Sequence, residues 1–227
     1  MNKILLTLLI LSVVFVAVAF LGANPSSLRG FYYVVWLSFC AYVWKQRDTL
    51  GNILKKSPLG GFLTFLGLGL LMIFIEETLA GIAVNILHVE SISALFATTT
   101  QFYANNFLLL PGFIVGWYIL LKRYAYTQKE VFVLVGLFGV LLSEKIHIHI
   151  FAIPILGIPL ILPTMFTYMG IIAPSILSMK EFGKREISVP IRYGIGLLFP
   201  WLVSIPFVVI HILLSRARIT DPTVLTG

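Results

Sequence analysis

The chain has 227 residues, of which 59% are hydrophobic and 11% charged, and its mean hydropathy is +1.01. Soluble domains carry about 25% charged residues, so one aqueous core cannot hold this many apolar side chains and most of the protein must face lipid. The net charge of +7 does not indicate a nucleic-acid partner, because the basic residues fall in short gaps between apolar runs. A single cysteine, Cys40, excludes a disulfide framework and a thiolate metal cluster.

Seven apolar runs approach the length of about 20 residues that a membrane-spanning helix needs. They predict an all-α integral membrane protein, a polytopic bundle of about seven transmembrane helices that forms a single domain over residues 1–227. If the first run is a cleaved signal peptide, with Ala17, Val18 and Ala19 as the cleavage motif, six helices remain. Its length favours a retained helix, because the apolar part of a signal peptide has about 7–15 residues. The predicted runs cover residues 4–23, 30–45, 61–87, 103–122, 130–148, 151–178 and 191–214.

Lysine and arginine gather in alternate gaps between the runs, at 45–56, 122–129 and 179–192. Alternate gaps lie on one side of a membrane, and the positive-inside rule makes this side the cytoplasm. We therefore expect a multi-pass protein of the plasma membrane with its N-terminus in the cytoplasm and its C-terminus outside. Two arginines of the C-terminal tail, Arg216 and Arg218, oppose this orientation.

Two runs carry signals for helix packing. Gly112 and Gly116 are four residues apart, a small-residue spacing that lets two helix backbones approach, and they predict a contact between helices or between copies of the chain. The run 151–178 contains four prolines, which predict an irregular helix or a discontinuous helix that lines a cavity.

The third run contains two adjacent acids, Glu76 and Glu77, near the middle of the membrane. A charged side chain there costs at least about 2.5–3.5 kcal/mol, which makes a functional role the default interpretation. At 100° per residue, Glu77 shares a polar stripe with Gly81, Asn85 and His88, whereas Glu76 points about 100° away. We therefore favour Glu77 first as the catalytic acid and Glu76 second, with Glu76 either neutral or hydrogen-bonded to a neighbouring helix.

Further polar residues fall on the same predicted outer half. The fourth run opens with Asn105 and Asn106. Together with Asn85 and His88 at the end of the third run, they are predicted to line one polar site. The alternative interpretation is that the asparagines form hydrogen bonds between helices. The fifth run ends with Glu144 and His147, whose spacing is that of ligands in carboxylate-bridged di-metal bundles. These two are candidate ligands of a divalent metal, and a polar outer loop is the alternative interpretation.

The segment 74–81, "FIEETLAG", resembles "PIEEFLFF" at the acidic site of the lycopene cyclase domain family of membrane carotenoid enzymes, with phenylalanine in place of the family's proline. In the sixth run, "ILGIPLILPTMF" resembles the second unit of that family, with Ile161 and Leu162 in place of its acids. The resemblance implies proton-driven chemistry on an isoprenoid chain, carried by Glu76 and Glu77. CAAX-type intramembrane proteases also have a glutamate pair, but Gly81 stands where that family has arginine.

Three functions follow from these patterns. The first is a membrane-embedded enzyme that acts on a lipid or isoprenoid by general acid–base catalysis; the second is a proton- or cation-coupled transporter or channel; the third is a structural subunit of a membrane complex. The sequence has no phosphate-binding loop, nucleophile elbow or HExxH motif, which argues against common ATP-driven pumps and zinc proteases. The acids and histidines predicted on one side favour the enzyme. Its expected partners are membrane lipids and an isoprenoid or small-solute substrate, without nucleic acid and without a cofactor beyond the candidate metal.

Overall fold

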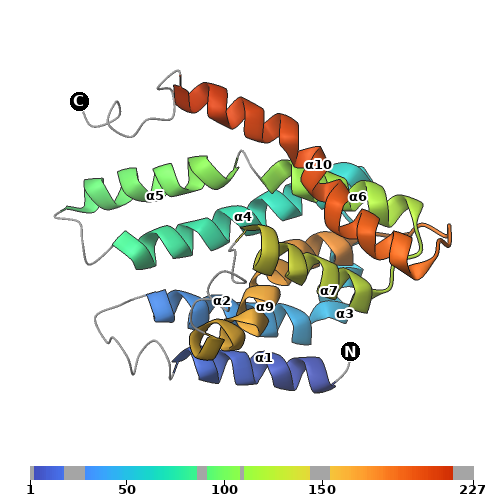
Figure 1. Ribbon diagram of the computed structural model, residues 1–227, viewed down its shortest axis with the longest axis horizontal. Coiled ribbons are helices and arrows are strands. Elements are labelled where there is room, and N and C mark those ends of the chain that lie inside the picture. Colours follow the sequence, from blue (N-terminus) through green and yellow to red (C-terminus); the bar gives the residue numbers. More distant parts are fainter. Residues whose placement is uncertain (1–2, 18–28, 86–90, 108–109, 144–153, 217–227) are drawn as a thin grey trace.

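The computed structural model describes residues 3–17, 29–85, 91–107, 110–143 and 154–216. Within these ranges the chain is helical apart from short connections and one isolated bridge between Tyr124 and Arg185, which confirms the predicted all-α class (Figure 1). The elements are α1 (Lys3–Val16), α2 (Arg29–Lys45), α3 (Arg47–Leu54), α4 (Gly61–Asn85), α5 (Ile92–Phe107), α6 (Leu110–Arg123), α7 (Gln128–Phe138), the π-helical turn η2 (Gly139–Ser143), α9 (Pro154–Ser178) and α10 (Val189–Arg216).

Three of the described helices are long and apolar enough to cross a membrane, over Gly61–Ala83, Leu160–Ser178 and Val189–Leu213. They belong to α4, α9 and α10 and indicate a helical membrane protein. Seven crossings are not shown, because α1, α2 and α7 have 14, 17 and 11 residues and a full crossing needs about 20.

The predicted run 103–122 is divided between two helices. α5 begins at Ile92, inside a stretch that the sequence predicted as a gap, and α6 begins at Leu110. Ser91 explains the start of α5, since its side chain accepts a hydrogen bond of 3.2 Å from the backbone N–H of Ala94. Pro111 suits the first turn of α6, where its missing N–H has no helical acceptor.

α4 lies at the centre of the bundle and packs against α2, α5, α6 and α9. Two glycines of α4 bring its backbone close to neighbours. A Cβ at Gly69 would lie 2.8 Å from the side chain of Ile114 on α6, and a Cβ at Gly81 would lie 3.2 Å from Thr99 on α5. α5 and α6 thus cover successive parts of α4, which positions the rest of its surface against α2 and α9.

Gly112 and Gly116 mediate a contact within the chain. Both are buried and face α10, where Gly112 lies beside Ser204 and a Cβ at Gly116 would lie 2.6 Å from the Cα of Pro200. α6 and α10 therefore pack through their backbones. An oligomer formed through these glycines stays a prediction.

The four prolines of the sixth predicted run do not interrupt it. α9 is continuous from Pro154 to Ser178. Two hydroxyl groups of α9 bond to backbone carbonyls: Thr167 donates a hydrogen bond of 3.0 Å to the carbonyl of Pro163 one turn earlier, and Ser175 donates one of 2.7 Å to that of Phe65 on α4. A discontinuous helix is therefore not found over these residues.

The three basic gaps meet at one end of the bundle, on the right in Figure 1. The N–H of Gly183 donates to the carbonyl of Leu121 (2.7 Å) and that of Ala125 to the carbonyl of Arg185 (3.1 Å), which joins the second gap to the third. α3, in the first gap, packs on the end of α9. This end, which holds residues 45–56, 122–129 and 179–192, is called the basic end below.

Candidate functional site

Glu76 and Glu77 both lie on the buried face of α4, each with 7% of its surface exposed. Met72 and Ile73, one helical turn earlier, are buried on the same face. The pair lies about 7 Å beyond the middle of the apolar span of α4, on the side away from the basic end. The sequence assigned the two acids to different stripes, whereas the packing of α2, α5 and α9 around α4 buries both.

Tyr32 of α2 donates a hydrogen bond from its hydroxyl to Oε1 of Glu76. Tyr32 is also close enough to Glu77 for an electrostatic interaction, and its ring stacks on that of Tyr33 with centroids 4.8 Å apart. Both glutamates have interaction partners in the folded chain. This geometry agrees with the expectation that Glu76 bonds to a neighbouring helix. It makes Glu76 at least as good a candidate for the catalytic acid as Glu77.

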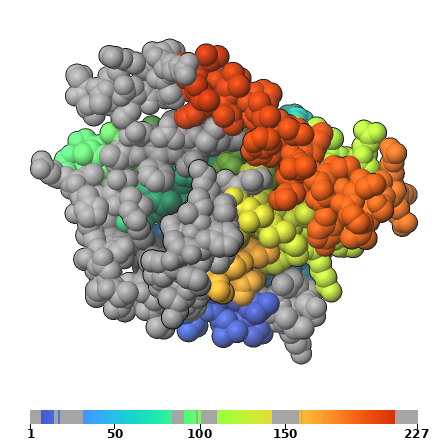
Figure 2. All heavy atoms as spheres, in the orientation of Figure 1, coloured from blue at the N-terminus to red at the C-terminus, as the bar shows by residue number. Residues whose placement is uncertain are grey.

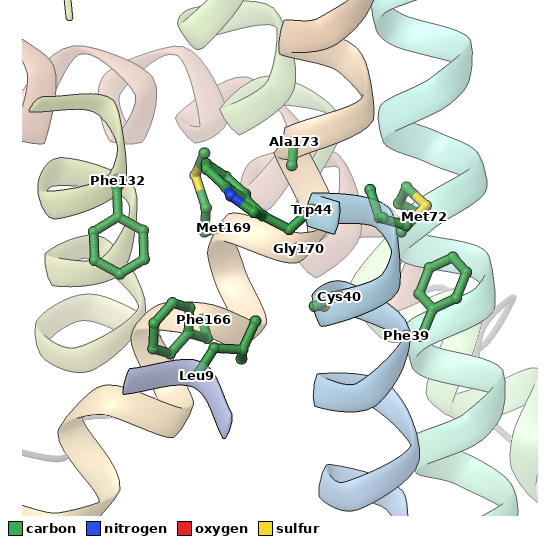
Figure 3. A pocket seen from close by; sticks show the side chains of 11 residues that line it. Leu9, Phe39, Cys40, Trp44, Met72, Phe132, Phe166, Met169, Gly170 and Ala173 are labelled. Carbon is green, nitrogen blue, oxygen red and sulfur yellow. The ribbon is translucent and has the colours of Figure 1, made fainter. Parts of the chain in front are cut away.

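An apolar pocket lies between α1, α2, α4, α7 and α9, and its wall on α4 is one helical turn from Glu76 (Figure 3); neither glutamate is among its lining residues. Met72, one turn before Glu76 on α4, and Cys40, two turns after Tyr32 on α2, both line it. Its volume of about 20 Å³ is room for about one water molecule. The other lining residues are Leu9, Phe39, Val43, Trp44, Phe132, Phe166, Met169, Gly170 and Ala173.

Two features shape this pocket. Gly170 of α9 has no side chain, and the Cys40 thiol of α2 occupies the space that a Cβ there would fill. The indole N–H of Trp44 is buried without a hydrogen-bond acceptor among the described residues, in a wall that is otherwise apolar. The pocket therefore presents hydrocarbon and a thiol to whatever enters it.

The structure brings only part of the predicted site together. Gly81 packs against Thr99 and α4 and α5 run antiparallel (Figure 1), so the backbones of Asn105 and Asn106 lie within about 5 Å of the level of Glu77 along the helix axis. Asn85 lies at the end of α4, about 12 Å further along the axis than Glu77.

The remaining predicted residues, His88, Glu144 and His147, lie outside the described residues. Within the described part of the chain, no three His, Cys, Asp or Glu side chains gather closely enough to hold a metal ion. The candidate metal ligands Glu144 and His147 stay a prediction.

Sequence reasoning missed the contribution of α2 to the site. Tyr32, Trp36 and Cys40 recur every four residues, which places them on one helical face, and this face packs against α4 and α9. The spacing was visible in the sequence. Nothing in the sequence, however, indicated that this face would meet Glu76 rather than lipid.

A buried ion pair lies at the basic end. Arg192 of α10 pairs with Glu130 of α7, with 15% and 11% of their side chains exposed. Thr127 and Glu130 form a capping box at the start of α7, and Tyr126 donates a hydrogen bond of 2.7 Å to the carbonyl of Arg192. Burial acts to raise the pKa of Glu130, but hydrogen bonds from Thr127 and the charge of Arg192 outweigh it and lower this pKa below its ordinary value of 4.5.

Comparison with protein-family models, with curated proteins and with solved structures finds no match to this chain. The chain is a helical protein with three candidate membrane spans and two buried glutamates on the central helix.

Proposed function

We propose that this protein is a membrane-embedded enzyme that acts on a lipid or isoprenoid by acid–base chemistry. The observation that supports this function best is the position of Glu76. Its buried carboxyl accepts a hydrogen bond from Tyr32 and lies one helical turn from Met72, which lines an apolar pocket. A hydrocarbon chain in the pocket would thus have a carboxyl group close to its reacting end.

Glu76 acts in this proposal by proton transfer. In its protonated form, the carboxyl adds a proton to a carbon–carbon double bond of the substrate and becomes a carboxylate, while the substrate becomes a carbocation. The Tyr32 hydroxyl stabilises this carboxylate by donating its hydrogen bond. Loss of a proton from a neighbouring carbon to the carboxylate completes an isomerisation or cyclisation and restores the acid, so no oxidant or reductant is needed.

Glu77 is the second acid of the proposed site. Two adjacent carboxyls in a water-poor environment disfavour double ionisation, so a negative charge on Glu77 favours the protonated form of Glu76. Asn105 and Asn106, near this level on α5, are proposed as further polar lining. A substrate must also widen the pocket, since about 20 Å³ holds no hydrocarbon chain, and we expect α1 or α2 to move on binding.

The proposed setting is the plasma membrane, with the basic end in the cytoplasm. The shorter helices would complete about seven crossings together with α4, α9 and α10. A transporter is less well supported, because the broken helix expected from the prolines is absent from the continuous α9. A purely structural role would leave the chemistry unaffected by changes at Glu76.

The test compares wild type with Glu76→Gln, which keeps the size of the side chain and removes its acidity. Lipids extracted from the cells that make the protein are incubated with each purified form and separated by chromatography. We expect wild type to convert one lipid species into another and Glu76→Gln to leave it unchanged. Glu181→Gln, which removes an exposed acid, serves as the matched control and should behave as wild type. Equal conversion by Glu76→Gln would exclude Glu76 as the acid.

A further inference from the structure

A second, wider groove lies between α6 and α10 and is not part of the glutamate site. Its volume is about 340 Å³, compared with about 20 Å³ for the pocket beside Glu76. It extends along α10 from Gly194 to Leu202, about 12 Å. α10 forms an exposed ridge of the surface at this place, orange in Figure 2. The side chains along the groove are Ile119, Leu120, Ile195, Leu198, Phe199 and Leu202.

One end of this groove is strongly basic. Arg123 and Tyr124 line it there, and the guanidinium groups of Arg123 and Arg185 lie 5.7 Å and 5.9 Å from the centre of the Tyr124 ring. Both arginines are exposed. Within the described ranges, neither has a carboxylate within 4.0 Å, since the ion pairs there involve Arg47 and Arg192. Two cations thus lie where an apolar groove reaches the basic end.

We propose that this groove binds an anionic phospholipid, with one acyl chain along the groove and the phosphate group at Arg123 and Arg185. The apolar walls match a hydrocarbon chain. The two guanidinium groups match a phosphate, which accepts paired hydrogen bonds from arginine. Basic pockets between helices are a recurrent form of headgroup site. The charge at one end and the apolar walls beyond it fix the direction in which the lipid lies.

Gly194 offers a way to fill the groove without disturbing the fold. A Cβ at Gly194 would have no atom within 4 Å, and the residue lies in the first part of α10. In Gly194→Leu the new side chain therefore occupies the groove itself. Gly67 of α4 also has open space where a Cβ would stand and lies outside the groove, so Gly67→Leu is the matched control.

The experiment uses the full chain in detergent, incubated with equal amounts of dioleoyl-phosphatidylglycerol and dioleoyl-phosphatidylcholine. The two lipids share their acyl chains and differ in net charge. After gel filtration, the bound lipids are extracted and quantified by mass spectrometry. We expect wild type to retain more phosphatidylglycerol than phosphatidylcholine. Arg123→Gln should reduce this preference about fivefold, the effect of one basic residue at an anionic surface, while Lys129→Gln, an exposed lysine of the same end, should leave it unchanged.

Gly194→Leu distinguishes the contribution of the groove to lipid binding from that of the surface charge. It should retain less of both lipids than Gly67→Leu, because it blocks the chain and leaves the arginines in place. Equal retention of the two lipids by wild type would overturn the proposal, as would equal effects of Arg123→Gln and Lys129→Gln, which would indicate diffuse attraction to the basic end. Equal lipid retention by Gly194→Leu and Gly67→Leu would show that the groove is not the site. If Gly194→Leu fails to fold, as judged by its elution in gel filtration, the comparison of Arg123→Gln with Lys129→Gln decides whether the proposal holds.

Discussion

The hydroxyl of Tyr32 donates a hydrogen bond to the carboxyl of Glu76 across the contact between α2 and α4. The two residues are 44 positions apart in sequence, and Glu76 is 7% exposed. A buried carboxyl without a partner is costly, so this bond both holds α2 against the central helix and fixes the direction of the carboxyl. The same bond would stabilise the carboxylate that remains after a proton has left.

Replacing Tyr32 by phenylalanine tests this bond. Tyr32→Phe keeps the ring and removes the donor, and we expect it to reduce the free energy of unfolding by about 0.5–1.5 kcal/mol, the range for a hydrogen bond to a neutral acceptor such as the protonated carboxyl proposed for Glu76. Thermal unfolding in detergent measures the loss. Tyr42→Phe on the same helix is the matched control, since Tyr42 is 61% exposed, and it should leave stability unchanged. Equal stability of Tyr32→Phe and Tyr42→Phe would mean that the bond contributes nothing to the fold.

Gly116 tests the packing of α6 on α10. In Gly116→Ala the added methyl group meets the backbone of Pro200 at 2.6 Å, so the two helices must separate. We expect a loss of about 1–3 kcal/mol, the usual cost of overpacking. Gly67→Ala, where the methyl group enters open space, should be neutral or slightly stabilising because alanine favours a helix more than glycine does. A stable Gly116→Ala variant would contradict the close approach of the two helices.

The ion pair between Glu130 and Arg192 predicts a pH dependence of stability. The folded chain lowers the pKa of Glu130 below 4.5, so the pair stabilises the fold fully above about pH 4.5 and loses this effect as the pH falls through the lower, folded-state pKa. Wild type should therefore be more stable than Glu130→Gln at pH 7, and the difference should shrink below pH 4.5. Unfolding curves of both forms across this range measure it. A difference that grows on acidification would contradict the sign of the shift.

Arg192, whose side chain is 15% exposed, should tolerate replacement poorly. Arg192→Met leaves Glu130 buried without its counter-charge, and we expect a loss of about 3 kcal/mol, the lower end of the range for a broken buried pair. The double variant Arg192→Met with Glu130→Gln should regain part of this loss. Comparison of the four forms in one unfolding series gives the coupling between the two residues. Additive losses would indicate that the residues act independently.

Cys40 reports directly on the pocket beside Glu76. It is the single cysteine of the chain, is 7% exposed and packs against Gly170. We expect N-ethylmaleimide to label it far more slowly in the folded protein than after denaturation in SDS. A lipid that enters the pocket should slow the reaction further. Labelling at the same rate before and after denaturation would show that the pocket is open to solvent.

Composition and apolar run length were enough to predict the helical class and most helix positions. α2, α4, α9 and α10 begin and end close to the predicted runs because each carries a long apolar signal in the sequence. α5 was missed because its Ser- and Thr-containing first half lacks that signal, and Ser91 instead starts the helix through a side-chain bond. α3 was missed because eight residues are too short for a run-length argument.

The acids of the site could be found in the sequence, but their surroundings could not. An intramembrane glutamate is conspicuous among apolar residues, and this identified Glu76 and Glu77. Helical phase alone then favoured Glu77, because it describes one helix and contains no information about which neighbour covers each face. The contact of α2 with α4 supplied Tyr32 as a partner of Glu76. A count of prolines also did not predict that α9 runs without a break from Pro154 to Ser178.

Solvent deuterium is the most direct test of the proposed proton transfer. Wild type, Tyr32→Phe and Glu76→Gln are incubated in D₂O with lipids extracted from the cells that make the protein, and deuterium bound to carbon is measured by mass spectrometry. An acid that takes its proton from solvent and adds it to a carbon–carbon double bond must place deuterium in the lipid. We predict incorporation by wild type, slower incorporation by Tyr32→Phe and none by Glu76→Gln. No incorporation by wild type, or equal incorporation by Glu76→Gln, would contradict the proposed role of Glu76.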